Sequence, residues 1–373
     1  MAEQTGAGTL PLDDHVSVRQ TADAGAPPST AVPSTPFPDV PALAPSVPSA
    51  FPSLADASHV AEGLPVAGSP PVAKARNIIH GWNALRVVAM LDIASFHLTH
   101  EYLFAGIGLP TFLLLSMCLP SMAPDPGNRR AMLRRRVERL AGPWAFWTAV
   151  LATIHIVRAV KHGEPPFGWF EPKMLLEGVE THFWYLPFVT VAGWLVYELD
   201  LLARRSSRPA AWLTMCLGVG LLACYLDASF VYYDPFSQWA FAAPAIPLGL
   251  AMGSLMRDSQ RVATVAFVAV FSAAATQLRA GGFAGGDGAT RFALASCILV
   301  VIWLLPSRRF RWLAVVEPLM LGIFMLHVTV GYVLVDHWLP RGTLPNIPYL
   351  LSVVTLTGLA VWTMRKTRLK RFL

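Results

Sequence analysis

From residue 76 onward, the sequence consists of long apolar runs separated by short polar segments. Ten of these runs are close to the 17–25 residues that an α-helix needs to cross a bilayer. They lie at 79–99, 103–123, 141–160, 181–203, 210–228, 238–256, 261–279, 291–306, 313–335 and 346–364. The pattern therefore predicts an all-α, polytopic membrane bundle of about ten transmembrane helices over residues 76–373.

Residues 1–75 differ from the rest of the chain. They are rich in Pro, Ala and Ser and contain no Trp or Tyr. Such a segment cannot bury enough apolar surface to fold alone, so we expect a disordered, Pro-rich N-terminal tail. It lacks the basic segment followed by an apolar segment that a signal peptide requires. The pattern leaves open whether the proline tract binds an unknown partner.

The basic residues indicate how the chain crosses the membrane. They cluster after the second, fourth, sixth, eighth and tenth runs, whereas the loop 229–237 has none. Cytoplasmic loops carry the excess of Lys and Arg. We therefore predict a multi-pass protein of the inner (plasma) membrane with both termini in the cytoplasm. The clusters contain Arg129, Arg130, Arg134, Arg135, Arg136 and Arg139; Arg204, Arg205 and Arg208; Arg257 and Arg261; Arg308, Arg309 and Arg311; and Arg365, Lys366, Arg368, Lys370 and Arg371.

Composition agrees with this assignment. The chain is 54% hydrophobic and 14% charged, whereas a soluble domain has about 25% charged residues. Topology accounts for the net charge of +6, so we expect lipid rather than nucleic acid as the partner. The four cysteines lie in apolar runs without CxxC spacing, which favours small buried hydrophobes over a disulfide framework or a metal site.

The first run carries the most informative polar side chains, Arg86, Asp92 and His97. Ionisable groups at membrane depth cost roughly 3 kcal/mol or more each, so they are candidates for function. Arg86 and His97 are eleven positions apart, which places them within about 20° of the same helix face and about 16 Å apart along the axis. His97 suits proton abstraction from a hydroxyl or a structural hydrogen bond. Arg86 suits an anionic ligand or an ion pair with Glu198 or Asp200.

Three other segments carry candidate side chains. Arg136 and Arg139 are one helical turn apart and are suited to phosphate, or they mark topology beside lipid phosphates. His182 and Trp184 open the fourth run and fit either the rim of an acceptor site or an aromatic interfacial belt. His327 lies within the ninth run, where a packing role and a site role are both open.

Five motifs in order resemble the membrane-bound acyltransferase family 3, the polytopic O-acyltransferases of bacterial surface glycans and some small molecules. They are NALRVVAM with the Arg86–His97 spacing, GIGLPTFLLLS (106–116), RRRVERLAGPW (134–144), HFWYLPFV (182–189) and IFMLHV (323–328). The chain departs from the family pattern at Asp92, where the family is usually apolar, in the form of its second helix, and in its tail.

The resemblance implies transfer of an acyl group, with acetyl expected, from cytosolic acyl-CoA to a hydroxyl of a glycan, a lipid-linked sugar or a related acceptor. It implies that His97 is catalytic and that Arg86, Arg136 and Arg139 face the coenzyme, with no metal and no bound cofactor. The residues expected to line the site are Asn83, Ser116, His182, Trp184 and His327. Two alternatives remain at this point: a proton-coupled transporter with Arg86 and His97 as a relay, and a non-catalytic membrane scaffold.

Overall fold

The computed structural model describes residues 72–123, 128–229, 235–283, 285–305, 310–337 and 346–373, and most of the predicted tail (1–71) lies outside them. All regular structure in these ranges is helical, which confirms the predicted fold class. The elements are α1 (Val72–Thr99), α2 (Gly108–Met122), α3 (Arg129–Lys161), α4 (Met174–Glu177), η3 (Thr181–Trp184), α5 (Tyr185–Arg205), α6 (Pro209–Ser229), α7 (Phe236–Ala242), α8 (Ala245–Arg257), α9 (Arg261–Ala280), α10 (Gly286–Leu304), α11 (Leu313–Val316), η4 (Glu317–Leu319), α12 (Met320–His337), α13 (Asn346–Arg365) and η5 (Arg368–Phe372).

Each of the ten predicted spans coincides with a helix or with consecutive helices. Within the described residues, eight segments are long and apolar enough to cross a membrane, from α3 to α13. The chain is therefore a multi-pass membrane protein. The first two predicted spans do not reach this standard. The polar side chains of α1 interrupt its apolar run, and α2 has only 15 residues because it begins at Gly108 rather than near residue 103.

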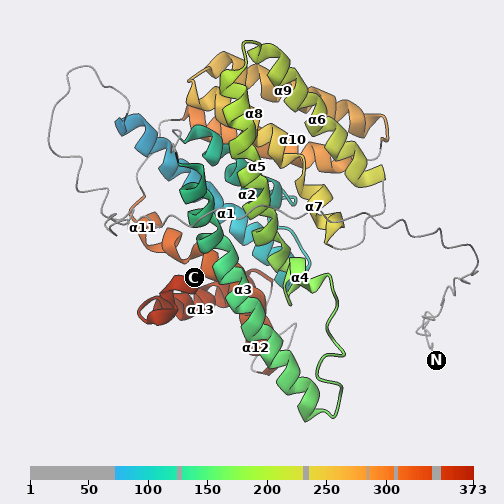
Figure 1. Ribbon diagram of the computed structural model, residues 1–373, viewed down its shortest axis with the longest axis vertical. Coiled ribbons are helices and arrows are strands. Elements are labelled where there is room, and N and C mark those ends of the chain that lie inside the picture. The colour runs from blue at the N-terminus through green and yellow to red at the C-terminus, as the bar shows by residue number, and fades with distance from the viewer. Residues whose placement is uncertain (1–71, 124–127, 230–234, 284, 306–309, 338–345) are drawn as a thin grey trace, which may run out of the picture. The chain divides into compact units, whose positions relative to one another are not determined.

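Helix α2 is the centre of the bundle. It packs against α1, α5, α8 and α10 (Figure 1), and most of its side chains are buried. Glycines allow this close approach, as is common between membrane helices. A Cβ at Gly253 of α8 would lie 2.6 Å from the carbonyl oxygen of Cys118, and one at Gly249 would overlap Met117. The short apolar run of α2 therefore contacts protein on most of its surface rather than lipid.

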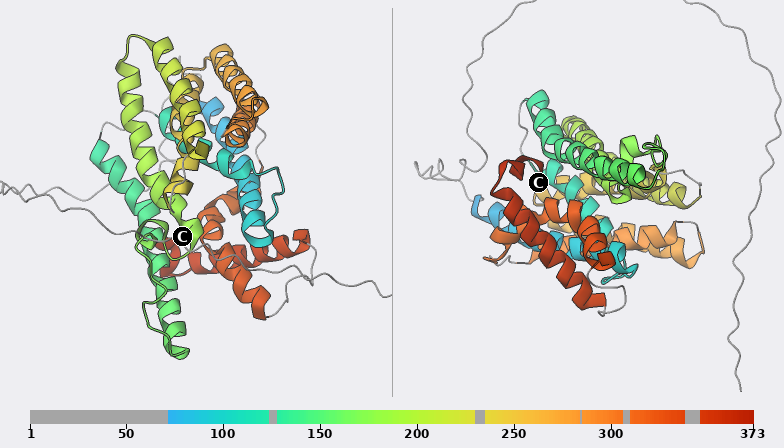
Figure 2. Two further views of the ribbon diagram at one scale, coloured as in Figure 1. Left: turned by 90° about the vertical axis from the view of Figure 1, so that its right-hand side faces the viewer. Right: turned by 90° about the horizontal axis from the view of Figure 1, so that it is seen from below.

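The remaining helices form two groups around α2 (Figures 1 and 2). Helices α6 and α9 pack with α8, and α10 packs with α9 and α6, whereas α12 and α13 pack with α1. The C-terminal η5 packs against α3, where the Trp147 indole donates a 2.9 Å hydrogen bond to the carbonyl of Phe372. Of the four cysteines, Cys297 is exposed and therefore contradicts the predicted burial, while the other three are buried as predicted.

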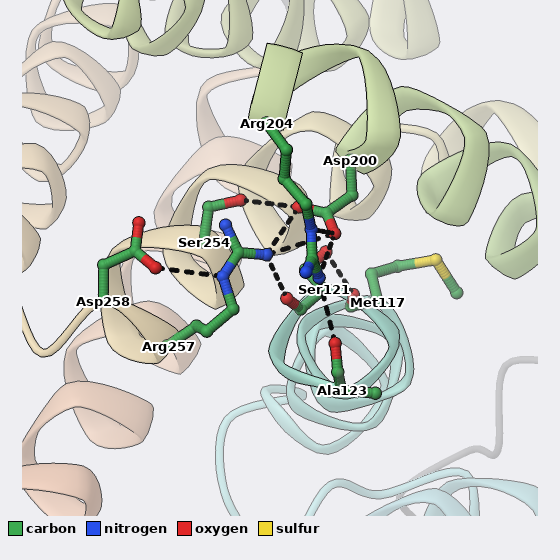
Figure 3. Close-up of polar contacts among 8 residues, drawn as sticks. All are labelled: Met117, Ser121, Ala123, Asp200, Arg204, Ser254, Arg257 and Asp258. Atoms are coloured by element: carbon green, nitrogen blue, oxygen red, sulfur yellow. Dashed lines mark hydrogen bonds and ion pairs between the residues drawn. The ribbon is translucent and has the colours of Figure 1, made fainter. Parts of the chain in front are cut away.

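A polar network joins the ends of α2, α5 and α8 (Figure 3). The buried Asp200 carboxylate pairs with Arg204 at 2.7 Å and with Arg257 at 2.8 Å. The same two guanidinium groups donate to the carbonyls of Ala123 and Ser121, which end α2. We call this end of the bundle, where Arg204 and Arg257 lie, the basic end. The network satisfies a buried charge and also fixes the three helices relative to one another.

Candidate functional site

Three histidines from three different helical segments meet in the interior. The ring centroids of His97 (α1) and His182 (η3) are 5.6 Å apart, and those of His97 and His327 (α12) are also 5.6 Å apart. The third pair, His182 and His327, is separated by 5.3 Å. His182 and His327 are buried, whereas His97 is partly exposed. The folded chain thus brings together residues that are 85 to 230 positions apart.

Backbone carbonyls determine the orientation of two of these rings. Nδ1 of His327 lies 2.8 Å from the carbonyl oxygen of Phe324, and Nε2 of His182 lies 3.3 Å from that of Met325. A carbonyl only accepts, so in both contacts the ring nitrogen is the donor. In a neutral His327 ring this leaves Nε2 as the unprotonated nitrogen, and this atom is buried without a partner among the described residues. A neutral His327 ring would therefore add a buried acceptor nitrogen to the cluster.

A cavity of about 480 Å³ opens beside the histidines. This volume lies within the usual range for small-molecule sites, which is roughly 300–1,000 Å³. Aromatic rings form much of its wall. The residues that matter here are Phe96, His97, Tyr102, His182, Trp184 and Tyr185. The histidine cluster is thus reachable by a ligand and is not sealed inside the packing.

Two arginines, Arg86 and Arg136, lie near Tyr185. Arg86 donates to Oδ1 of Asn83 at 3.2 Å, and Arg136 donates through Nη2 to the carbonyl of Val189 at 2.7 Å. Both guanidinium groups interact electrostatically with Tyr185 and with the exposed Arg139. The arginines predicted to face a coenzyme are therefore gathered next to the cavity, on the side of the α3 N-terminus.

Gly193 on α5 provides the space for Arg136. A Cβ at this position would overlap the guanidinium group. The missing side chain at Gly193 leaves room for the Arg136 guanidinium against α5. The guanidinium there donates to the main-chain carbonyl of Val189 instead of pairing with a carboxylate. It keeps further donors available for an anionic ligand.

Tyr185 connects the histidine side with the arginine side. Its hydroxyl lies 2.6 Å from Oγ of Ser116, and Ser116 in turn donates to the carbonyl of Phe112 at 2.8 Å. Since the serine proton is used in that second bond, Tyr185 is the donor in the first. Sequence reasoning missed Tyr185, although it stands inside the motif HFWYLPFV. From sequence alone, a tyrosine at a helix end fits a functional site and the membrane interface equally well.

The acidic residues Asp200 and Glu198, which were suggested as partners of Arg86, pair with other arginines. Asp200 pairs with Arg204 and Arg257, and Glu198 pairs with Arg129 at 3.2 Å. The suggested ion pairs between Arg86 and these two acids are therefore wrong, because both acids lie at the basic end with nearer partners. The carboxylate that interacts electrostatically with Arg86 is Glu317.

Asp92 has a structural explanation. Its Oδ1 accepts from the backbone N–H of Phe104, and its Oδ2 accepts from that of Gly108, both at 2.8 Å. Gly108 is required here because a Cβ would lie 2.6 Å from the Asp92 Cβ. The carboxylate thus satisfies N–H groups at the start of α2 and holds residues 104–108 at the edge of the cavity, which explains this departure from the family pattern.

All nine residues predicted for the site lie in or near this region. His97, His182 and Trp184 line the cavity, His327 completes the cluster, and Ser116 is one hydrogen bond away through Tyr185. Asn83 orients Arg86, and Arg136 and Arg139 lie on the far side of Tyr185. In the part of the chain that the structure describes, no group of His, Cys, Asp and Glu side chains is arranged to hold a metal ion.

Comparison with known proteins identifies the family of the chain. Searches of curated proteins and of solved structures give no match. A family model described as an acyltransferase domain matches residues 79–365, which is most of the chain and contains every residue of the site. The protein therefore belongs to acyltransferase family 3 and is a membrane acyltransferase.

Proposed function

We propose that this acyltransferase moves an acyl group, with acetyl expected, from acyl-CoA to a hydroxyl of a glycan, a lipid-linked sugar or a related acceptor. The observation that carries the proposal is the cluster of His97, His182 and His327 beside an aromatic-lined cavity. No specific observation supports the alternative of a proton relay between Arg86 and His97.

In the proposed mechanism, His97 is the general base. It takes the proton of the acceptor hydroxyl while the hydroxyl oxygen attacks the thioester carbonyl carbon. The C–S bond then breaks, and the proton held by His97 passes to the departing CoA sulfur. His97 suits this role because it is the histidine of the cluster that is partly exposed and lines the cavity. The neighbouring rings keep it in place.

The arginines would hold the donor. Arg86, Arg136 and Arg139 concentrate positive charge next to Tyr185, on the side of the α3 N-terminus. Guanidinium groups bind phosphate oxygens strongly, often through two parallel hydrogen bonds. The rise of about 16 Å between Arg86 and His97 suits the extended pantetheine arm of a coenzyme. In this proposal the donor comes from the cytoplasm and the N- and C-termini are cytoplasmic.

Transfer of radiolabel from acetyl-CoA into the glycan and lipid fractions of membranes tests the base. We expect His97→Ala to abolish incorporation with unchanged protein level, because the other two rings of the cluster are buried and only His97 is partly exposed to the cavity. His162→Ala is the matched control, since His162 is exposed at the end of α3. Incorporation by His97→Ala comparable to wild type would contradict the assignment.

The same assay tests the donor site. Replacing both Arg136 and Arg139 with Ala should mainly raise the KM for acetyl-CoA, because these residues are proposed to bind the coenzyme without touching the reacting atoms. Arg134→Ala is the control, since Arg134 is exposed and pairs with Glu138 on the surface of α3. A fall in kcat alone would assign the two arginines another role.

A further inference from the structure

The cavity has a second polar end, formed by α10, α7 and the α1–α2 loop. Arg291 of α10 lines it, and its Cζ lies 5.3 Å from the centroid of the Tyr102 ring. Gly106 makes room for this contact, since a Cβ there would be 3.3 Å from Nη1 of Arg291. Gly106 also has a φ of +72°, a conformation that glycine adopts without strain. The chain is thus shaped around the guanidinium group.

Arg291 lacks an acidic partner among the described residues. The ion pairs of the described chain involve other side chains, and the nearest acid in sequence, Asp287, pairs with Arg279. A partly buried guanidinium group bound only to an aromatic face keeps its hydrogen-bond donors unused. Such a cation next to an apolar wall is costly unless an anion completes it.

Gln238 gives an independent indication of a polar ligand. It lines the same cavity from α7, and its Oε1 is buried without a hydrogen-bond partner among the described residues. Buried polar atoms are normally paired, so a side chain of the cavity wall with an unpaired oxygen can turn to meet a ligand donor. A hydroxyl or amide N–H of a bound molecule would satisfy Gln238, while an anion would satisfy Arg291.

Aromatic rings connect this end of the cavity to the histidines. The Tyr102 ring stacks on Phe96 with centroids 4.5 Å apart and an angle of 8°. Phe96 in turn lies 5.7 Å from the His97 ring. A ligand that touches Arg291 and reaches His97 would therefore lie along an aromatic wall, which suits the apolar C–H surface of a sugar ring.

We propose that the acceptor carries an anionic group, a carboxylate or a phosphate, which Arg291 binds at the end of the cavity away from the basic end. Gln238 would accept a hydrogen bond from the same molecule. This inference rests on the proposed function and narrows its acceptor class to acidic saccharides or phosphorylated sugars. The anionic group is separate from the hydroxyl that receives the acyl group, because Arg291 and the histidines lie at different ends of the aromatic path.

Binding measurements test this inference without relying on turnover. The purified protein in lipid nanodiscs would be titrated calorimetrically with methyl glucuronide, glucose 6-phosphate and methyl glucoside. We expect at least one charged sugar to bind wild type about ten-fold or more tightly than the neutral glucoside, the scale of a charge-assisted hydrogen bond. The two charged probes distinguish carboxylate from phosphate. The preference should weaken as salt rises.

Three variants complete the experiment. Arg291→Gln should lose the preference for the charged sugar, and Arg291→Lys should retain part of it. Arg279→Gln is the matched control, an exposed arginine at the end of α9 that lies outside the cavity, and should bind like wild type. Equal binding of charged and neutral sugars, absence of binding to wild type, or an unchanged preference in Arg291→Gln would each overturn the inference.

The two experiments test the proposed function and the anionic subsite independently of each other. Label transfer by wild type but not by His97→Ala, with no charge preference in binding, would retain the enzyme mechanism and reject the anionic subsite. A charge preference lost in Arg291→Gln, with no transfer from any acyl-CoA, would retain the subsite and reject the mechanism.

Discussion

Asp92→Asn tests whether one buried carboxylate organises the edge of the cavity. The carboxylate accepts two backbone N–H groups at 2.8 Å, from Phe104 and Gly108, and is only 1% exposed. An asparagine keeps one acceptor oxygen but turns an NH₂ group toward the other N–H. A hydrogen bond to a charged group contributes about 1.5–3 kcal/mol, and a buried donor left unpaired costs about 1–3 kcal/mol. We therefore expect a local loss of about 2–4 kcal/mol.

Hydrogen exchange of residues 104–108 measures this loss directly. Exchange protection follows the free energy of local opening, and 1.4 kcal/mol corresponds to ten-fold, so protection of the Phe104 and Gly108 amides should fall roughly 30-fold or more. Asp287→Asn serves as the control, since this exposed aspartate makes only a surface ion pair at 3.3 Å. Unchanged protection at Phe104 and Gly108 in Asp92→Asn would refute the reasoning.

Three further predictions concern other parts of the bundle. Asp200→Asn should lower stability by about 3–5 kcal/mol, because it leaves two guanidinium groups without their buried partner, and reversible unfolding in nanodiscs would measure it. Gly193→Ala should raise the KM for acetyl-CoA by displacing Arg136, whereas Gly142→Ala, where a Cβ meets nothing within 4 Å, should not. Burial raises the pKa of Glu180, which lies outside the spans. Its ionisation therefore opposes folding, and stability is lost as the pH rises through the folded pKa. Melting at several pH values should show that Glu180→Gln is the more stable form at pH 7 and loses less stability between acidic and neutral pH.

Hydropathy predicts the helices well because every backbone polar group inside a bilayer must be satisfied, and a helix does this locally. The predicted helix bounds fail for a helix that is surrounded by other helices rather than by lipid. Helix α2 is shorter than its apolar run because the Asp92 carboxylate accepts hydrogen bonds from the backbone N–H groups of Phe104 and Gly108. These bonds are tertiary contacts between α1 and the segment that precedes and begins α2. Local sequence does not encode such a contact.

The site could be predicted in part for a similar reason. Helical geometry alone places Arg86 and His97 on one face of α1. The sequence also marked His182 and His327 as candidates with open roles, and the resemblance assigned both to the site. Tyr185, Gln238 and Arg291 were missed because their chemistry depends on which groups face them: a serine for Tyr185, no partner for Gln238 and an aromatic ring for Arg291. These relations arise only when distant segments pack together.

We propose that the site receives its acyl donor from the side of Arg86, Arg136 and Arg139 and its acceptor from the opposite side. Sealed membrane vesicles of both orientations, supplied externally with radiolabelled acetyl-CoA, test this most directly because the coenzyme does not cross the membrane. We expect label transfer only in inside-out vesicles, where the arginine side faces the added donor, and no transfer with His97→Ala in either orientation. Transfer in right-side-out vesicles, or transfer that persists in His97→Ala, would contradict the account.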